Sequence, residues 1–263
     1  MSAWPDKLAS FASIIMSFDS LLVFLDMDLL LAIGIIIFAA IISGYTGFGG
    51  ALFQVPLMVM LFGPVEAVAV TRLVSMFGRA QLYPSSARTA NWSEVFPLVI
   101  AIVVITPFAS SVLFIADPDL IRRGIGGLVI ALTIFMLSGW QYRGPRRWPA
   151  SLSFGAACGA LAGVAGIGGP PMVVYFMAGP DEARVKRANI IITVALVTLV
   201  VLITFIVKGG VGISTLVRAA ILFPASIAGT WIGNWIFKIA PQSYFRKFAL
   251  GVLFATGLAA LLL

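Results

Sequence analysis

The chain has 263 residues, of which 61% are hydrophobic and only 10% are charged. Soluble domains are nearer half apolar and a quarter charged, so too few charges remain here to build a water-facing surface. The composition therefore indicates an all-α polytopic membrane protein. The net charge of +7 does not indicate a nucleic-acid partner, because the basic residues sit alone or in short clusters between apolar runs, as topology signals do.

The chain contains no histidine and a single cysteine, Cys158. This excludes a disulfide within the chain and argues against a metal site. The lack of histidine also removes most enzyme mechanisms, which need a nucleophile with a base or a bound metal. G-x-S-x-G and Walker A motifs are missing as well. We therefore expect no enzymatic activity, no cofactor and no ATP-driven action by this chain alone.

Residues 1–28 form an amphipathic N-terminal segment. Its apolar part, Leu8 to Leu25, is interrupted by Asp19 and lacks the basic start and small-residue cleavage site of a secretory signal. We interpret it as a helix that lies at the membrane interface or braces the bundle. A first membrane crossing is the alternative, since its length is close to what a span needs.

Eight apolar segments follow, and about twenty apolar residues suffice to cross a bilayer as a helix. They are 29–62, 67–87, 95–116, 125–140, 150–178, 190–207, 217–237 and 248–263. The first and the fifth are too long for one crossing, and both contain glycine-rich interruptions. The longest polar break, 141–149, reads QYRGPRRWP. This basic linker divides the chain into a first transmembrane half, 29–140, and a second, 150–263.

The two halves contain similar motifs in the same order. The glycines of SGYTGFGG at 43–50 coincide with those of AGVAGIGG at 162–169. In a second match, Gly63-Pro64 and Glu66 correspond to Gly179-Pro180 and Glu182. In a third, Ala116-Asp-Pro118 and Arg123 correspond to Ile239-Ala-Pro241 and Arg246. Ordered matches at a near-constant offset indicate an internal duplication.

The glycine motifs predict broken helices. Each glycine weakens a helix by about 1 kcal/mol relative to alanine, and opened backbone in a membrane persists only inside protein or beside a wet cavity. Close helix packing would be the simpler explanation. The prolines that follow each motif, Pro56 and Pro170-Pro171, favour a restarted helix instead. Broken helices at corresponding places of two halves mark the substrate site in many transporters.

The distribution of lysine and arginine favours a hairpin at each motif. If both motifs cross the membrane, the basic residues divide almost evenly between its two sides. If both turn back as re-entrant hairpins, the loops 141–149 and 179–187 share one side and gather most basic residues, as the positive-inside rule requires. Each half then has three spanning helices plus a hairpin. This predicts an inverted repeat of seven to eight apparent transmembrane segments, with a cytoplasmic linker and both termini outside.

The duplicated motifs resemble the sulfite exporter TauE/SafE family, also called the 4-toluene sulfonate uptake permease family. The elements that carry the resemblance are SGYTGFGGALFQVPLM at 43–58 and AGVAGIGGPPMVVYFM at 162–177. It extends over roughly 29–263. The resemblance implies a transporter in the bacterial inner membrane for small sulfur-containing or carboxylated anions, such as sulfite, sulfonates or sulfoacetate.

An anion inside hydrocarbon needs substitutes for its hydration, and helix N-termini provide them through free N–H groups and a positive dipole end. Glycine lets this backbone approach a ligand closely. We therefore expect the substrate between the two motifs, with Gln54 adding a hydrogen bond. The candidate motif residues are Thr46, Gly47, Gly49, Gly50, Gly166, Gly168 and Gly169.

Two arginines lie within the apolar segment 67–87. Arg72 and Arg79 are seven residues apart, so a continuous helix would place them on one face. Intramembrane arginines are costly and usually face a cavity or a partner, which makes both candidate anion contacts. Arg72 could instead reach the lipid headgroups. Asn189 occupies a similar place in the second half and is a further candidate.

The leading hypothesis is a secondary transporter that moves small sulfur anions by alternating access, with the anion and membrane lipid as partners. An anion channel or a carboxylate transporter of the same fold is the alternative, and a structural membrane subunit would leave the duplicated broken helices unexplained. No intramembrane carboxylate suggests a proton relay, so an exchanged or co-transported ion stays open. Gly229 and Gly233 could pack helices within the chain or across a homodimer.

Overall fold

The computed structural model describes residues 27–138, 140 and 142–239, and these residues form helices and loops without strands. The helices are α3 Met27–Thr46, α4 Gly50–Phe62, α5 Pro64–Gly78, the 3-10 helix η1 Ala80–Leu82, α6 Tyr83–Thr89, α7 Trp92–Ile115, α8 Pro118–Leu137, α9 Trp148–Ala165, α10 Gly169–Met177, α11 Ala183–Val207 and α12 Ile213–Ile239. Most of the expected interfacial segment 1–28 and the last expected span, 248–263, lie outside the described residues.

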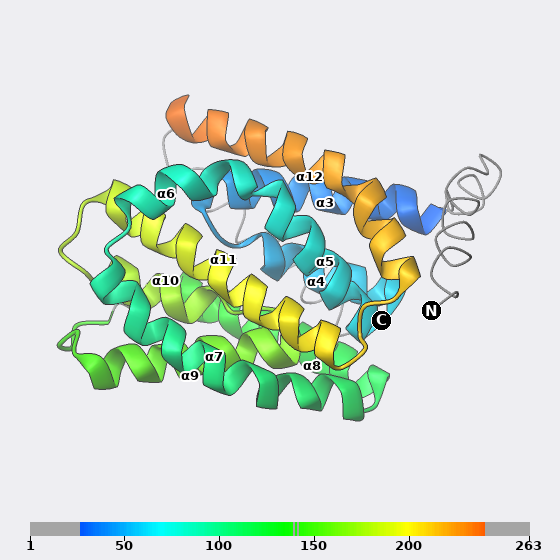
Figure 1. Ribbon diagram of the computed structural model, residues 1–263, viewed down its shortest axis with the longest axis horizontal. Coiled ribbons are helices and arrows are strands. Elements are labelled where there is room, and N and C mark those ends of the chain that lie inside the picture. The colour runs from blue at the N-terminus through cyan, green and yellow to red at the C-terminus, as the bar shows by residue number, and fades with distance from the viewer. Residues whose placement is uncertain (1–26, 139, 141, 240–263) are drawn as a thin grey trace, which may run out of the picture.

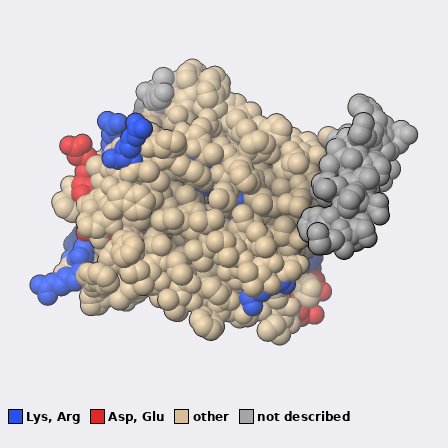
Figure 2. Space-filling view, viewed as in Figure 1, with Lys and Arg blue, Asp and Glu red and all other residues tan. Residues whose placement is uncertain are grey.

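Five of the described helices, α3, α7, α9, α11 and α12, are long and apolar enough to cross a membrane. Their flanks expose large apolar side chains such as Phe108, which is 74% exposed, and extended apolar surface of this kind marks contact with lipid. Figure 2 shows Lys, Arg, Asp and Glu gathered mainly at two opposite ends of the viewed face. The fold is therefore an all-helical membrane bundle.

The apolar segment 29–62 folds into a helical hairpin. α3 ends at Thr46, and α4 runs back beside it, because a Cβ on Gly50 would lie 2.5 Å from the carbonyl oxygen of Ala39. The rings of Phe38 and Phe53 are 4.8 Å apart along the same interface. The turn uses Gly49 at φ 89°, a left-handed conformation that glycine adopts without a steric penalty. The segment thus breaks at its glycine motif, as the sequence predicts. The prediction that Pro56 marks the restart is wrong, because α4 begins at Gly50 and Pro56 lies inside it.

The apolar segment 150–178 folds in the same way. α10 runs back along α9, since the hydroxyl groups of Ser151 and Tyr175 lie 2.7 Å apart and the Tyr175 ring packs 5.5 Å from that of Phe154. Gly166 ends α9 at φ 65°. The N–H groups of Gly166 and Ile167 donate to the Ala162 and Leu161 carbonyls of α9, at 3.0 and 3.1 Å, so backbone donors of the turn partner two carbonyls near this helix end.

Each hairpin begins with a helix that packs against a helix of the other half. Gly155, Gly159 and Gly163 bring α9 against α7, at the four-residue spacing of small-residue interfaces. Gly229 and Gly233 bring α12 against α3, where a Cβ on Gly229 would lie 2.6 Å from the Ile37 carbonyl oxygen. This glycine pair therefore packs helices within the chain. In Figure 1, α3 and α12 run side by side, as do α7 and α9.

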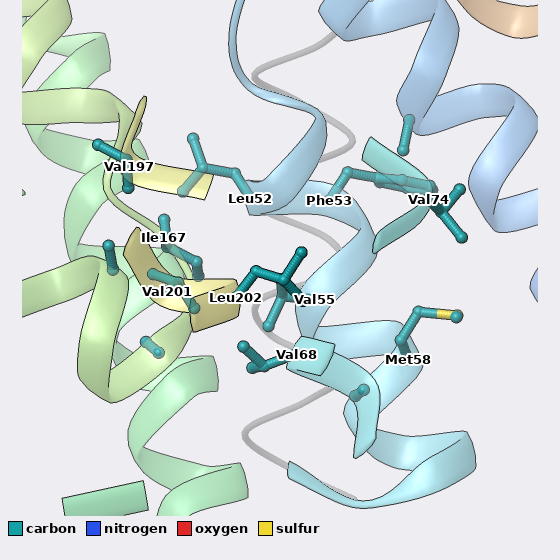
Figure 3. Close-up of a cluster of buried hydrophobic side chains, with 14 of the residues drawn as sticks. Leu52, Phe53, Val55, Met58, Val68, Val74, Ile167, Val197, Val201 and Leu202 are labelled. Carbon is teal, nitrogen blue, oxygen red and sulfur yellow. The ribbon is translucent and has the colours of Figure 1, made fainter. Parts of the chain in front are cut away.

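The best-buried core joins the two hairpins to α5 and α11. Figure 3 shows side chains of α4 and α5 packed towards α11 and the break after α9. The labelled residues are Leu52, Phe53, Val55, Met58, Val68, Val74, Ile167, Val197, Val201 and Leu202, all less than 9% exposed. The hairpin tips are therefore held between the two halves of the bundle.

The loops separate into two ends of the molecule. Arg146 of the linker pairs with Asp181 at 3.6 Å, so the linker and the loop after α10 share one end, as the hairpin topology predicts. We call it the linker end; it lies at the left of Figure 1. Glu66 and Arg218 pair at 2.6 Å at the opposite end, beside the turn at Gly63. That turn and the 208–212 loop line one surface depression there.

The apolar segment 67–87 is not one helix, so the prediction that Arg72 and Arg79 share a helix face is wrong. α5 ends at Gly78, Arg79 follows outside it, and the chain resumes as η1 and α6. Pro84 explains the break, because it has no N–H to donate to the Ala80 carbonyl and its ring would collide with that group. Proline is well suited to the first turn of a helix, and α6 begins at Tyr83.

Candidate functional site

The two hairpin tips meet at a cavity of about 20 Å³, roughly the space of one water molecule. Its walls come from the first tip, the second tip, the α5 region and α11. The lining residues are Phe48, Gly49 and Ala51; Gly168, Gly169 and Met172; Arg72 and Arg79; and Val194 and Val197. Four segments distant in the sequence thus form one site, which we call the tip cavity.

Arg72 and Arg79 are only 4% and 5% exposed. Among the described residues, neither forms an ion pair with a carboxylate, and the Nε and Nη2 atoms of Arg72 have no hydrogen-bond partner. A buried charge without a partner is strongly unfavourable, and more so within a membrane. The tip cavity therefore offers two uncompensated positive charges to a ligand.

Two helix N-termini add to this positive potential. α4 begins at Gly50 after Gly49, and α10 begins at Gly169 after Gly168, and neither first turn is capped by a side chain. Each N-terminus carries the equivalent of about half a positive charge. Pro170 and Pro171 have no N–H, so Gly168 and Gly169 are the backbone donors nearest the cavity on α10. Arginines and helix N-termini together make a site for an anion.

A larger surface depression, of about 370 Å³, lies at the opposite end of the molecule from the linker. It is wide open and lined by loop residues of the 62–66 and 209–215 segments. Glu66 contributes a carboxylate to its wall, which would repel an anion. We therefore place the candidate anion site at the tip cavity and not at this depression.

Five of the predicted site residues line the tip cavity: Gly49, Gly168, Gly169, Arg72 and Arg79. Gly47 and Gly166 lie directly behind the tips. A Cβ on Gly47 would contact Ile191 and the Arg187 side chain at 3.2 and 3.5 Å, and one on Gly166 would contact Val68 and Arg72 at 3.1 and 3.3 Å. These two glycines let α11 and α5 approach the tips.

Thr46 and Gly50 shape the first tip from within. The Thr46 hydroxyl bonds to the carbonyl of Ile42 at 2.8 Å and to that of Phe48, and it accepts the N–H of Phe48 at 3.2 Å. Gly50 packs directly on the backbone of Ala39. Both residues therefore hold the turn in place and stand outside the cavity lining.

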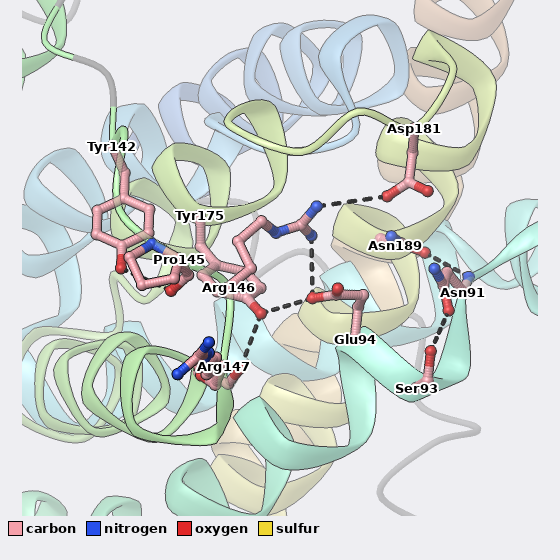
Figure 4. Close-up of polar contacts among 11 residues, drawn as sticks. Asn91, Ser93, Glu94, Tyr142, Pro145, Arg146, Arg147, Tyr175, Asp181 and Asn189 are labelled. Atoms are coloured by element: carbon pink, nitrogen blue, oxygen red, sulfur yellow. Dashed lines mark hydrogen bonds and ion pairs between the residues drawn. The ribbon is translucent and has the colours of Figure 1, made fainter.

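Gln54 and Asn189 connect helices away from the cavity. The Gln54 side-chain amide donates to the Ser75 hydroxyl at 3.1 Å and joins α4 to α5. The Asn189 side-chain oxygen accepts the backbone N–H of Asn91 at 2.7 Å, which ties α11 to the start of α7 (Figure 4). Each of these polar residues is buried and held by another residue, and neither lines the tip cavity.

Arg187 belongs to the first tip, whereas its place in the sequence groups it with the basic residues of the 179–187 loop. Its Nη2 donates to the Gly44 carbonyl at 2.8 Å and to the Asn234 side chain at 3.2 Å. Its guanidinium also lies 4.1 Å from the centre of the Phe237 ring. Gly44 is in the last turn of α3, where carbonyls lack helical partners. Arg187 thus caps α3.

A second polar cluster closes the linker end, and we call its residues Glu94, Arg146, Tyr175 and Asp181 the linker clamp (Figure 4). Arg146 lies 3.1 Å from Glu94 and 3.6 Å from Asp181, with its guanidinium 4.8 Å from the centre of the Tyr175 ring. The Tyr175 hydroxyl donates to Glu94 at 2.5 Å. One arginine therefore joins α7, α10, the linker and the loop before α11. These pairings join residues distant in the sequence, and no local pattern indicates them.

A family model described as Sulfite exporter TauE/SafE matches residues 31–260, which include both hairpins, Arg72, Arg79 and the linker clamp. No curated protein and no solved structure matches the chain. The match spans most of the 263 residues. It agrees with the spanning helices and the paired hairpin tips described above. The chain is a membrane transporter that belongs to the sulfite exporter TauE/SafE family.

Proposed function

We propose that this protein is a secondary transporter that moves small sulfur anions, such as sulfite or sulfonates like sulfoacetate, across the bacterial inner membrane. The observation that carries the proposal is the tip cavity, where two buried arginines without carboxylate partners face two helix N-termini. The sulfur chemistry rests on family membership. The bound anion would supply the negative charge that the arginines lack.

The two halves are proposed to form an inverted repeat. Gly47 and Gly166 are 119 residues apart, and their neighbours follow the same offset. Gly47 contacts Arg187 and Ile191 of α11, whereas Gly166 contacts Val68 and Arg72 of α5. The contact between the tip glycine of one half and the facing helix of the other half is therefore the same when the two halves are exchanged. The hairpins also open towards opposite ends, since α9 begins at the linker end and α4 ends at the Gly63 turn.

The linker end is proposed to face the cytoplasm, with both chain termini outside. Basic residues gather there more densely than at the other end, in the sense of the positive-inside rule. Those of the described part at the linker end are Arg88, Arg143, Arg146, Arg147, Arg184 and Lys186, against Arg122, Arg123, Lys208 and Arg218 at the other. Such an orientation puts the linker clamp on the cytoplasmic side.

Alternating access would then use the ion pairs at the two ends. The linker clamp closes the cytoplasmic side, and the Glu66–Arg218 pair closes the other side. The Arg218 guanidinium also lies 4.3 Å from the centre of the Phe62 ring. An anion that neutralises Arg72 and Arg79 lowers the cost of moving the tips relative to α5 and α11. The ends open in turn, and each opening exposes the same site.

Uptake by proteoliposomes tests the proposal. Radiolabelled sulfite, sulfoacetate, taurine and a plain carboxylate would be offered to the wild type, to Arg79→Ala and to Arg122→Ala. Arg122 is the matched control, because it is partly exposed and pairs with Asp119 one turn away on α8. We expect saturable uptake and counterflow of a sulfur anion, lost only in Arg79→Ala. Linear flux without counterflow would instead identify a channel, and uptake of the carboxylate alone would contradict the sulfur substrate.

A further inference from the structure

We infer that the tip cavity selects doubly charged oxyanions over singly charged anions of the same size. This inference rests on the proposed function and adds the charge of the substrate to it. Its basis is the balance of buried charge around Arg72 and Arg79. The cavity lining holds two arginines, no aspartate and no glutamate.

The acidic residues of the described chain are all located at helix ends. Glu66 pairs with Arg218, Glu94 and Asp181 pair with Arg146, and Asp119 pairs with Arg122. Asp117 caps α8, and Asp28 and Glu182 are exposed. The sequence contains no Asp or Glu after Glu182, so the segment 240–263 brings no acidic side chain to the cavity. The described chain therefore leaves both charges of the tip cavity to the ligand.

Arg72 is free for a ligand because it does not cap the adjacent helix end. The N–H groups of Gly166 and Ile167 donate to the Ala162 and Leu161 carbonyls of α9, and two nitrogens of Arg72 stay without partners among the described residues. Arg187 at the first tip is the contrasting case, since the Gly44 carbonyl and Asn234 occupy it. The two tips thus differ. Arg187 at the first tip stabilises the fold, whereas Arg72 at the second tip is available to a ligand.

The other cavity walls cannot compensate for a missing negative charge. Phe48, Met172, Val194 and Val197 present apolar side chains, and the helix N-termini add positive potential. A singly charged anion would leave about one buried positive charge without a partner. Removing one partner from a buried charge pair weakens binding by about 30-fold or more. We expect this factor to separate doubly from singly charged ligands.

Two matched ligand pairs measure the effect of charge at constant size. Methanesulfinate differs from sulfite, and methanesulfonate from sulfate, by a methyl group in place of one charged oxygen. Calorimetric titration of the purified protein at mildly alkaline pH, where sulfite carries two charges, would give the affinity ratio within each pair. We expect the dianion of at least one pair to bind about 30-fold or more tightly than its methyl analogue.

Charge-removing variants connect this ratio to the arginines. Arg72→Gln and Arg79→Gln should each reduce the ratio towards one, mainly by weakening the dianion, whereas Arg122→Gln should leave it unchanged. If Arg72→Gln does not fold, Arg79→Gln makes the same test. Equal affinities within both pairs in the wild type would overturn the inference and leave the proposed anion site standing, as would a ratio that neither variant changes. Failure of all four anions to bind folded protein would overturn the proposed function itself.

Discussion

Arg72 and Gly166 lie in contact although they belong to different halves of the chain. A Cβ built on Gly166 would lie 3.3 Å from Nη2 of Arg72, and Gly166 has φ 65°, where other residues are strained. The buried guanidinium reaches the second hairpin tip because glycine leaves the space open. This contact couples the charge on α5 to the turn between α9 and α10.

Gly166→Ala should therefore impair both folding and transport. The left-handed backbone costs an alanine about 1–2 kcal/mol, and its methyl group would press on Val68 and Arg72. We expect a lower thermal unfolding midpoint and a reduced affinity for the anion. Gly34→Ala is the matched control, because nothing lies within 4 Å of that position inside α3 and alanine favours a helix. Equal behaviour of the two variants would contradict this account of the tip.

Cys158 should report unfolding without an engineered cysteine. It is the single cysteine of the chain and is fully buried on α9. A thiol-reactive dye should label the folded protein slowly and the heated protein quickly, which gives the unfolding midpoint of every variant proposed here. Rapid labelling of the folded wild type would contradict the packing of the second hairpin. A Cys158→Ala variant supplies the background signal.

The linker clamp should stabilise the closed linker end. Arg146→Gln would leave Glu94 and Asp181 without a cation, and these carboxylates are only 23% and 21% exposed. We expect a loss of roughly 1 kcal/mol, which corresponds to about 2–4 °C in the unfolding midpoint for a chain of this size. Arg147→Gln is the control, since Arg147 is the exposed neighbour.

Gly179 provides a second test of the same clamp. A Cβ at this position would overlap the Arg146 guanidinium, so Gly179→Ala should displace Arg146 and lower the midpoint in a similar way. If both changes act on one interaction, the double variant should lose less than the sum of the single losses. Additive losses would show that Gly179 acts independently of the clamp.

Gln54→Leu should affect stability more than substrate binding. Gln54 donates to Ser75 between α4 and α5, at a position outside the cavity lining. Removing the amide leaves a buried hydroxyl without this partner, at a cost of about 1–3 kcal/mol. The midpoint should fall while the anion affinity of the folded protein stays within about twofold, a small change on the scale where tenfold is 1.4 kcal/mol. A selective loss of affinity would place Gln54 on the substrate path after all.

The sequence predicted the hairpins because their signals are local. Glycines in the turns and the prolines at the start of α10 act on the backbone around them, so the sequence predicts that Gly49, Gly168 and Gly169 lie at the breaks. Arg72 and Arg79 followed from the cost of charge in hydrocarbon. The break after Gly78 was missed, although Pro84 was a local signal for it, because the segment 67–87 is mostly apolar and fits one span.

The remaining contacts depend on tertiary structure, which a single sequence does not reveal. Gln54 and Asn189 are polar residues in apolar helices, and the anion site was the nearest explanation for both. Their partners, Ser75 and Asn91, come from other helices. Arg146 likewise meets acidic residues 52 positions before it and 35 after it. Only the assembled bundle brings each of these polar side chains to its partner on another element.

The central claim is that the transported anion binds between the hairpin tips, and anomalous diffraction from a selenium oxyanion tests it most directly. Selenite and selenate reproduce the shape and charge of sulfite and sulfate, and selenium can be located without ambiguity. The account predicts a selenium peak in the tip cavity, within hydrogen-bond reach of Arg72 or Arg79 and beside Gly168 and Gly169. A peak confined to the depression at Gly63 and Thr215, with none between the tips, would contradict it.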